Sequence, residues 1–347
     1  MADSSKPIVL HLGDPVKHCP GLYAQLCEKF TVIRPELADR QRPAFLENLR
    51  TKKWGDFAAI TRGQWSTGNE MAPYDAELIS LLPKSLKVIA SAGAGYDWVN
   101  TGLLAEAGIL YCNGASASSE AVADMAIYHI ISVFRNMQWT NMAARTLDRE
   151  QWLDAHHSSP FTALNPRGHV LGVIGLGNIG YTIAEKAYKA FGMKIVYFDP
   201  FPKSAEQEAA IEARRVEDMD EFLGQADCVV LAAPGGGGKI ITAERIAKMK
   251  KGSRLVNIAR GTLVDTDAVA DAMDSGHLFA VGLDVHEDEP NVNPRLVSKR
   301  NATLTCHTAG GALDTNIGFE RLAIENVLLV LDGKAPLTAV NKHLIKA

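Results

Sequence analysis

The sequence lacks the features that mark several classes of protein. Its 36 Lys and Arg residues are outnumbered by 40 Asp and Glu residues, and the net charge is −4. No excess of positive charge is therefore available for nucleic acid or for an anionic membrane surface. No uninterrupted apolar run approaches the roughly 18 residues that a membrane-spanning helix needs. The N-terminal stretch MADSSKPIVLHLG has no basic segment followed by an apolar core, so we expect no secretory signal.

Cysteine is scarce and has no regular spacing. The chain of 347 residues holds five, namely Cys19, Cys27, Cys112, Cys228 and Cys306. An odd number at wide spacing, without a CxxC pair, excludes a disulfide framework and a structural zinc site, and favours a cytoplasmic protein with reduced thiols. His156 and His157 resemble a metal-binding pair, but no further ligand completes a site, so we expect a surface loop there and no bound metal.

Short β-rich runs alternate with helical patterns along the whole chain. At roughly 100–200 residues per domain, the length predicts two domains, and 47% hydrophobic residues are typical of globular proteins. Strands are expected at 7–13, 30–35, 56–61, 86–93 and 108–113, and a second set at 169–175, 194–199, 227–233, 253–259, 279–285 and 302–306. Helices are expected at 75–83, 118–145, 178–191, 242–250, 262–276 and 315–333. This alternation predicts parallel sheets covered by helices on both faces. The charged run 206–220 reads as a solvated helix face.

A dinucleotide-binding fingerprint opens the second set of strands. The segment GLGNIG follows an expected strand and begins a helix; it comprises Gly175, Leu176, Gly177, Asn178, Ile179 and Gly180. Glycines at these positions allow a tight turn, the approach of a pyrophosphate and close packing of helix on strand. Asp199 ends the next strand, where a carboxylate binds ribose hydroxyls and repels a 2′-phosphate. The expected cofactor is therefore NAD rather than NADP.

A second glycine-rich segment, PGGGGK at 234–239, does not fit a phosphate-binding P-loop. Such a loop needs an earlier glycine where Ala233 stands and Ser or Thr where Ile240 stands. We expect a flexible loop at the carboxyl end of a strand, where Pro234 and the glycines could still touch the cofactor.

Four polar residues follow expected strands of the second set: Arg260, Asp284, Glu289 and His307. The carboxyl ends of parallel strands share one edge of a sheet, so these side chains are expected to converge. An arginine can clamp a carboxylate, and a histidine can exchange a proton near neutral pH. Together with a nicotinamide, an anion anchor and an acid/base are the parts that hydride transfer needs.

Five segments, in this order along the chain, resemble the D-isomer-specific 2-hydroxyacid dehydrogenases. They are SAGAGYDWVN, VLGVIGLGNIG, LVNIARGTLVDTDAV, GLDVHEDEP and TCHTAGG. The resemblance covers essentially the whole chain. It implies two doubly wound parallel-sheet α/β domains, with a Rossmann NAD-binding domain (117–316) inserted in a flavodoxin-like substrate domain (1–116 and 317–347).

The resemblance also implies roles for single residues. Arg260 would bind the substrate carboxylate, His307 would be the acid/base, and Glu289 would be its partner. Asp284 would contact the nicotinamide side of NAD. The cofactor site would further include Ala259, Arg260, His307 and Gly310. The amides of Gly93, Ala94 and Gly95 would receive the substrate carboxylate. The helix that begins at 118 would form the contact between the two subunits of a homodimer.

The chain departs from the family pattern at three places. Cys306 replaces the proline that usually precedes the catalytic histidine, PGGGGK replaces a Pro-x-Thr loop, and His286 takes a position that is usually aromatic. Cys306 could influence His307 or simply pack. The altered loop leaves the detailed cofactor contacts open.

The substrate is expected to be a small 2-hydroxy or 2-oxo acid. Within the family the chain looks most like the fungal branch that acts on D-mandelate. The candidates for an apolar substrate pocket are Leu12, Gly13 and Trp65. Trp65 could equally be ordinary core. The alternatives are a glyoxylate or hydroxypyruvate reductase, and a non-catalytic NAD(H) sensor. Formate oxidation is disfavoured, because glutamine is expected there in place of Glu289.

Overall fold

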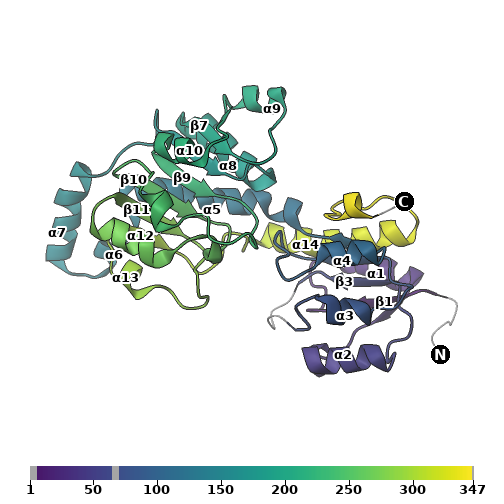
Figure 1. Cartoon of the computed structure of the whole chain (residues 1–347). Coiled ribbons are helices and arrows are strands. Elements are labelled where there is room, and N and C mark those ends of the chain that lie inside the picture. The colour runs from purple at the N-terminus through teal and green to yellow at the C-terminus, as the bar shows by residue number, and fades with distance from the viewer. Residues whose placement is uncertain (1–5, 65–69, 346–347) are drawn as a thin grey trace. The chain divides into compact units, whose positions relative to one another are not determined.

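The structure is a computed structural model that describes residues 6–64 and 70–345. The chain divides into two compact units, the first made of Met1–Ser118 with Gly311–Ala347 and the second of Ser119–Gly310. In Figure 1 the first unit combines the purple and yellow ends of the chain, and the second is teal and green. Trp65, one of the candidate pocket residues, lies outside the described residues.

The first unit is built on a five-stranded sheet with the order β2-β1-β3-β4-β5. All neighbouring strands are parallel. The strands are β1 (Ile8–His11), β2 (Thr31–Ile33), β3 (Ala59–Arg62), β4 (Val88–Ser91) and β5 (Leu110–Cys112). Each one overlaps a range expected from the sequence.

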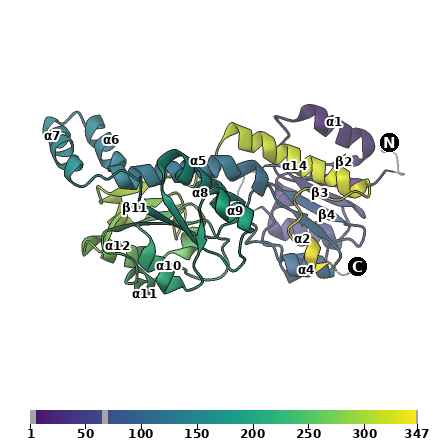
Figure 2. The same cartoon turned by 90° about the horizontal axis from the view of Figure 1, so that it is seen from above.

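Helices cover both faces of this sheet, as Figure 2 shows. One face carries α1 (Pro20–Lys29) and α14 (Leu313–Leu331), whose Leu26 and Val327 pack against Val9. The other carries α2 (Arg42–Arg50), α3 (Ala76–Ser80) and α4 (Thr101–Glu106). Successive strand residues point to opposite faces, so Leu10 belongs to the core under α2 while Val9 belongs to the core under α14.

The second unit holds a seven-stranded parallel sheet with the order β12-β11-β10-β9-β6-β7-β8. The strands are β6 (Val170–Ile174), β7 (Lys194–Phe198), β8 (Arg214–Arg215), β9 (Cys228–Leu231), β10 (Ser253–Asn257), β11 (Leu278–Leu283) and β12 (Ala302–Leu304). The chain order reverses between β6 and β9, and ligands of such sheets bind beyond the carboxyl ends of the strands at this point.

Two layers of helices also cover the second sheet. One face packs on α5 (Ala115–Arg135) and α8 (Asn178–Phe191), the other on α10 (Met219–Gln225), α11 (Ala243–Ile246) and α12 (Thr266–Asp274). The expected fold class, two parallel-sheet α/β domains of which one is a Rossmann domain, is confirmed.

The single helix expected over 118–145 is wrong. Helix α5 ends at Arg135, and α6 (Met137–Arg145) begins after Asn136. Asn136 takes a left-handed conformation with φ +54, which asparagine tolerates better than most residues. Its side-chain amide also donates to the Thr162 hydroxyl at 2.8 Å, a contact between segments that helical periodicity cannot reveal.

Two smaller expectations are also wrong. The charged run 206–220 is not one helix face, because it contains most of α9 (Ala205–Ala210), the edge strand β8 and the start of α10. His156 and His157 lie in a helix, α7 (Arg149–Ser158), rather than in a loop. The His156 ring stacks on Trp152, with 4.9 Å between the ring centroids.

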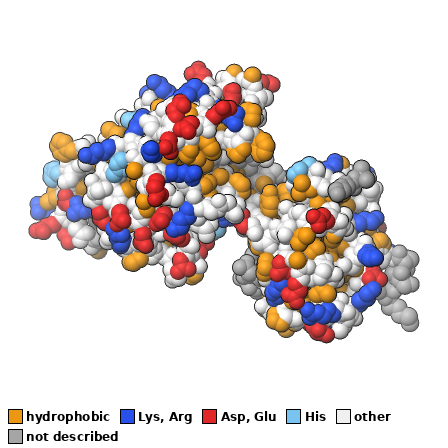
Figure 3. All heavy atoms as spheres, in the orientation of Figure 1, with side chains coloured by type: hydrophobic (Ala, Val, Ile, Leu, Met, Phe, Trp, Pro, Cys, Tyr) orange, Lys and Arg blue, Asp and Glu red, His pale blue; other side chains and the backbone are white. Residues whose placement is uncertain are grey.

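Charges of both signs are interspersed on the viewed face of each unit (Figure 3), in agreement with the small net charge. Within 6–64 and 70–345, no helix is both long enough and apolar enough to cross a membrane.

Candidate active site

The three fingerprint glycines play different parts at the end of β6. Gly175 has φ +88, and a Cβ there would lie 2.9 Å from the backbone of Ala233. A Cβ at Gly180 would lie 2.0 Å from the Gly175 carbonyl oxygen, so only glycine fits there. Around Gly177, by contrast, nothing lies within 4 Å of such a Cβ. The turn therefore needs two glycines for its own packing and keeps the third one open to a ligand.

Gly177 is also the N-cap of α8, and no side chain caps this helix end. The first turn of α8 holds no acidic residue either. Unpaired N–H groups and the helix dipole make such an end favourable for a phosphate group. The residues present thus fit the pyrophosphate of a dinucleotide. The Leu176 side chain is fully buried, whereas Asn178 is exposed and Ile179 half-buried beside the turn.

Asp199 directly follows β7 and is tied to the fingerprint. One carboxylate oxygen accepts a hydrogen bond from the Leu176 N–H at 2.8 Å, and the other accepts from the Phe201 N–H at 2.9 Å. The negative charge is therefore fixed beside the glycine turn, where the ribose of a bound dinucleotide is expected.

The glycine-rich loop after β9 is anchored at its end. Lys239 lies 2.8 Å from Glu287 and 3.2 Å from Asp265. The hydrogen bond to Glu287 raises the pKa of Lys239. Pro234 is exposed at the start of the loop, and Gly236 and Gly238 both have positive φ.

His307 and Glu289 are in direct contact. The Nδ1 atom of His307 lies 2.8 Å from Oε2 of Glu289. A carboxylate only accepts hydrogen bonds, so Nδ1 carries the proton of this bond and Nε2 is the nitrogen left for proton exchange. The imidazole is 51% exposed, which leaves Nε2 accessible to a small molecule.

Asp284 is fully buried behind this pair and holds the turn that carries His307. Its carboxylate accepts from the N–H groups of Thr308 and Ala309 at 2.9 and 2.8 Å, and from the Thr305 hydroxyl at 2.6 Å. Its carbonyl oxygen accepts from the His307 N–H at 2.7 Å. The structure thus gives Asp284 a role in holding the 305–309 turn, beside the nicotinamide contact expected from the resemblance. Gly310 follows this turn and is half-buried.

Arg260 lies on a turn after β10 that packs against the segment leading to Glu289. The buried Asn257 fixes this turn, donating to the Arg260 carbonyl at 2.8 Å and accepting from the Ala259 N–H at 3.0 Å. A Cβ at Gly261 would lie 1.8 Å from the His286 carbonyl oxygen, so the two backbones touch. Arg260 also donates to the carbonyl of the buried Ala259 at 2.7 Å.

The first unit contains the remaining expected residues. Gly93 has φ +89, and its carbonyl accepts from the Gly114 N–H at 2.8 Å. The side chain of Asn113 donates to the Ala94 carbonyl at 2.9 Å. These bonds hold the Gly93–Gly95 loop at the carboxyl end of β4. Leu12, a candidate for the substrate pocket, is instead fully buried in the core.

Sequence reasoning missed a buried charge cluster in the first unit. Arg40 lies 2.9 Å from Glu70, and Arg62 lies 3.9 Å from the same carboxylate. Arg62 also stacks over the ring of Trp98 at 5.2 Å. Arg62 is the last residue of β3, and the four polar residues of the expected catalytic set likewise follow strands of the second unit. A charged residue at the end of an expected strand was therefore the sequence signal that could have revealed this cluster.

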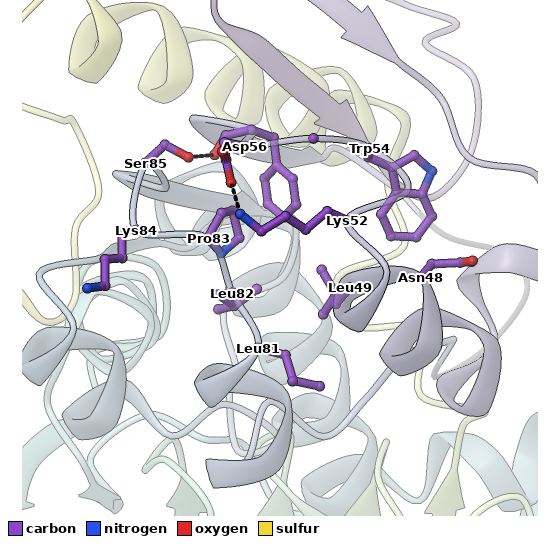
Figure 4. Close-up of a pocket in the computed structure, with 12 residues that line it drawn as sticks. Asn48, Leu49, Lys52, Trp54, Asp56, Leu81, Leu82, Pro83, Lys84 and Ser85 are labelled. Atoms are coloured by element: carbon purple, nitrogen blue, oxygen red, sulfur yellow. Dashed lines mark hydrogen bonds and ion pairs between the residues drawn. The ribbon is translucent and has the colours of Figure 1, made fainter.

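A cavity of about 440 Å³ lies elsewhere in the first unit (Figure 4). Trp54, Phe57 and Ser85 line it and precede β3 and β4, so it opens at the amino ends of the strands. At its rim Lys52 pairs with Asp56 at 3.2 Å. None of the expected site residues lines this cavity.

The sequence profile of the D-isomer specific 2-hydroxyacid dehydrogenase NAD binding domain matches residues 127–309. Among curated proteins, 4-methyl-2-oxopentanoate reductase A of Aspergillus oryzae is 33% identical over 336 residues, which cover 96% of this chain and 98% of that protein. Glyoxylate reductase of Thermococcus kodakarensis is 33% identical over 275 residues, covering 78% of this chain and 81% of that protein.

Comparison with solved structures also finds enzymes that act on hydroxy or oxo acids. The holo form of Rhodotorula graminis D-mandelate dehydrogenase is 43% identical, with a TM-score of 0.93 and coverage of 97% of this chain and 98% of that chain. A glyoxylate reductase from Paecilomyes thermophila is 34% identical, with a TM-score of 0.87 and coverage of 98% and 99%. The expected resemblance and the expected cofactor are confirmed. The chain belongs to the D-isomer-specific 2-hydroxyacid dehydrogenase family and is an NAD-dependent oxidoreductase.

Proposed function

We propose that the chain interconverts a D-2-hydroxy acid and its 2-oxo acid, with His307 as the acid/base. The contact between His307 Nδ1 and Glu289 Oε2 at 2.8 Å carries this assignment. The second unit binds NAD through the fingerprint 175–180 and Asp199, and the amides of the Gly93–Gly95 loop are proposed to bind the substrate carboxylate.

NADH, when bound, would supply the hydride that reduces C2 of the 2-oxo acid. Protonated His307 donates the proton on Nε2 to the C2 oxygen, while Glu289 stabilises the imidazolium. Arg260 holds the substrate carboxylate and offsets the charge that develops on the oxygen. In the oxidation direction, neutral His307 accepts the hydroxyl proton at Nε2.

The acid/base assignment is tested with His307→Ala. We expect kcat to fall by about two to four orders of magnitude, as for the loss of a general acid, while NADH still binds. Turnover at the wild-type rate would overturn the assignment. Fluorescence titration with NADH measures cofactor binding independently of turnover.

The substrate side chain is proposed to be aromatic or branched and apolar, with D-mandelate and phenylglyoxylate as the first choice. The similarity to D-mandelate dehydrogenase and to 4-methyl-2-oxopentanoate reductase A supports this choice. The similarity to a glyoxylate reductase keeps a small-substrate reductase as the second candidate.

A panel of 2-oxo acids separates these possibilities. We expect kcat/KM for phenylglyoxylate or 4-methyl-2-oxopentanoate to exceed that for glyoxylate and hydroxypyruvate, and chiral analysis to show the D-product. A preference for glyoxylate would favour the second candidate. Absence of turnover with every member of the panel would favour a non-catalytic NAD(H) sensor.

We also propose a homodimer that uses the segment 137–164. Six of the 14 large hydrophobic side chains that are exposed within 6–64 and 70–345 lie in this segment. Leu147 and Phe161 are the most exposed of them, at 97% and 89%. Such a concentration of exposed apolar side chains favours a protein partner. Light scattering should show a dimer, and Leu147→Asp with Phe161→Asp should give a monomer, whereas Val297→Asp on α13 (Pro294–Val297) should not.

A cytoplasmic location is proposed from the thiols. All five cysteines are free. Free thiols persist in a reducing compartment. Cell fractionation should place the protein in the cytosol.

A further inference from the structure

The 305–309 turn that carries His307 is held in an uncommon backbone conformation. His307 has φ +54, in the left-handed region, which is unfavourable for a residue other than glycine. The turn keeps this conformation because Asp284 binds the backbone N–H groups of His307, Thr308 and Ala309. Whatever fixes Asp284 therefore also fixes the direction of the His307 ring.

The Thr305 hydroxyl links Asp284 to a buried histidine. Its Oγ1 atom lies 2.6 Å from Oδ1 of Asp284 and 3.0 Å from Nε2 of His129. As a carboxylate, Asp284 can only accept, so the single hydroxyl proton points to it. The hydroxyl oxygen must then accept from His129, which requires a proton on Nε2.

His129 is suited to this one role. It lies on α5, is fully buried, and its Nδ1 has no hydrogen-bond partner within 6–64 and 70–345. Burial lowers the pKa of His129 to about 4, so the ring is neutral and Nδ1 carries a lone pair. Gly282 on β11 makes room for the ring, since a Cβ there would lie 2.9 Å from Nδ1.

Thr305 is held from its other side as well. Its carbonyl oxygen accepts from Nε2 of His286 at 2.8 Å. The His286 N–H in turn donates to Oε1 of Glu289 at 2.9 Å, and the other oxygen of Glu289 binds His307. Thr305 thus lies where the bonds from His129, Asp284 and His286 meet.

We propose that His129 and Thr305 are positioning residues for His307. His129 sets the direction of the Thr305 hydroxyl, the hydroxyl completes the hydrogen bonding of Asp284, and Asp284 holds the left-handed turn. This inference rests on the proposed acid/base role of His307. Proton transfer depends steeply on the placement of the donor, so a loosened turn lowers the rate of the chemical step more than the binding of NADH.

Thr305→Val tests the proposal, because valine keeps the shape of threonine and removes the hydroxyl. We expect kcat to fall about tenfold or more, as for a misplaced catalytic group, with the Kd for NADH little changed. Thr305→Ser should restore most of kcat, since it returns the hydroxyl.

The chain offers a matched control one helical turn further along α5. There the Ser132 hydroxyl binds the Thr303 hydroxyl at 2.6 Å, a buried bond from α5 to β12 that does not involve the 305–309 turn. Thr303→Val should lower the free energy of unfolding about as much as Thr305→Val and leave kcat close to wild type. Equal losses of kcat in both variants, or no loss in Thr305→Val, would overturn the proposal.

The proton positions can be observed directly. In protein with ¹⁵N-labelled histidine, near pH 7, His129 should appear as a neutral ring protonated on Nε2. The signal is assigned by its loss in His129→Gln. A proton on Nδ1 instead would overturn the proposed direction of the bonds.

His307→Ala keeps the two proposals distinguishable. If it retains turnover, the proposed acid/base role fails, and the positioning proposal fails with it. If it is inactive while Thr305→Val has normal kcat, only the positioning proposal fails.

Discussion

Glu289 contacts both the His307 ring and the backbone of His286. One carboxylate oxygen lies 2.8 Å from His307 Nδ1 and the other 2.9 Å from the His286 N–H. The carboxylate therefore orients the imidazole and is itself held in place by the backbone.

Glu289→Gln tests the carboxylate at this contact. Glutamine is nearly isosteric, but it cannot stabilise an imidazolium by charge, and its single oxygen can accept from Nδ1 or from the His286 N–H but not from both. We expect kcat to fall by about 100-fold, at the lower end of the range for acid/base catalysis, with unchanged NADH affinity. Steady-state kinetics and fluorescence titration measure the two quantities. A variant with wild-type kcat would show that the charge of Glu289 plays no part in proton transfer.

Two glycines of the fingerprint should respond differently to a methyl group. Gly177→Ala has open space and should fold normally, but it should weaken NADH binding about tenfold because the methyl obstructs the cofactor. Gly180→Ala should lower the free energy of unfolding by about 2 kcal/mol or more, because its Cβ would lie 2.0 Å from the Gly175 oxygen. Thermal unfolding and NADH titration of both variants check the pair. A stable Gly180→Ala protein would contradict the geometry of the turn.

Asp199 should determine the preference between the two dinucleotides. Asp199→Ser removes the carboxylate that would repel a 2′-phosphate, so kcat/KM should fall with NADH and rise with NADPH. Asp199→Asn is the control: it removes the charge and keeps an oxygen for the Leu176 N–H, although its amide nitrogen no longer accepts from the Phe201 N–H. If the Asn variant shifts toward NADPH as far as the Ser variant, charge rather than size is responsible. No shift in either variant would show that Asp199 does not select the cofactor.

Acid should destabilise the fold through buried histidines. Burial lowers the pKa of His11 from 6.5 to about 4, and its ring accepts from the Tyr23 hydroxyl while donating to the Asp14 carbonyl. The unfolded chain binds this proton more readily, so the stabilisation is complete above pH 6.5 and is lost as the pH falls toward 4. The loss is on the order of 3 kcal/mol for this histidine.

Urea unfolding at several pH values between about 4 and 6.5 measures this loss of stability. His11→Gln should flatten the dependence on pH, whereas His343→Gln, at an exposed position, should leave it as in the wild type. An unchanged slope in His11→Gln would show that His11 is not the group responsible.

The break between α5 and α6 should depend on the left-handed Asn136. Asn136→Gly loses the side-chain bond to Thr162 but keeps an easy positive φ, whereas Asn136→Ala loses both. We expect Ala to be less stable than Gly by about 1 kcal/mol. Chemical unfolding compares the two variants. An alanine variant as stable as the glycine variant would mean that the helix continues through this residue without strain.

The sequence by itself determined the parts of this protein that local patterns encode. Continuous apolar runs predicted the parallel strands, and the fingerprint at 175–180 with Asp199 predicted the cofactor. The order of Arg260, Asp284, Glu289 and His307 after successive strands placed them at one edge of the sheet. Each of these inferences needs only neighbouring residues or the shared direction of parallel strands.

The tertiary structure alone decided how these groups are held. The bond from His129 to Thr305 joins residues 176 positions apart, and the buried pair of Arg40 and Glu70 joins the short 3-10 helix Ala38–Arg40 to a separate turn. The break at Asn136 likewise depends on Thr162. Such contacts arise from packing between distant segments, where a buried polar group must find a partner wherever the fold provides one. No local periodicity records that choice.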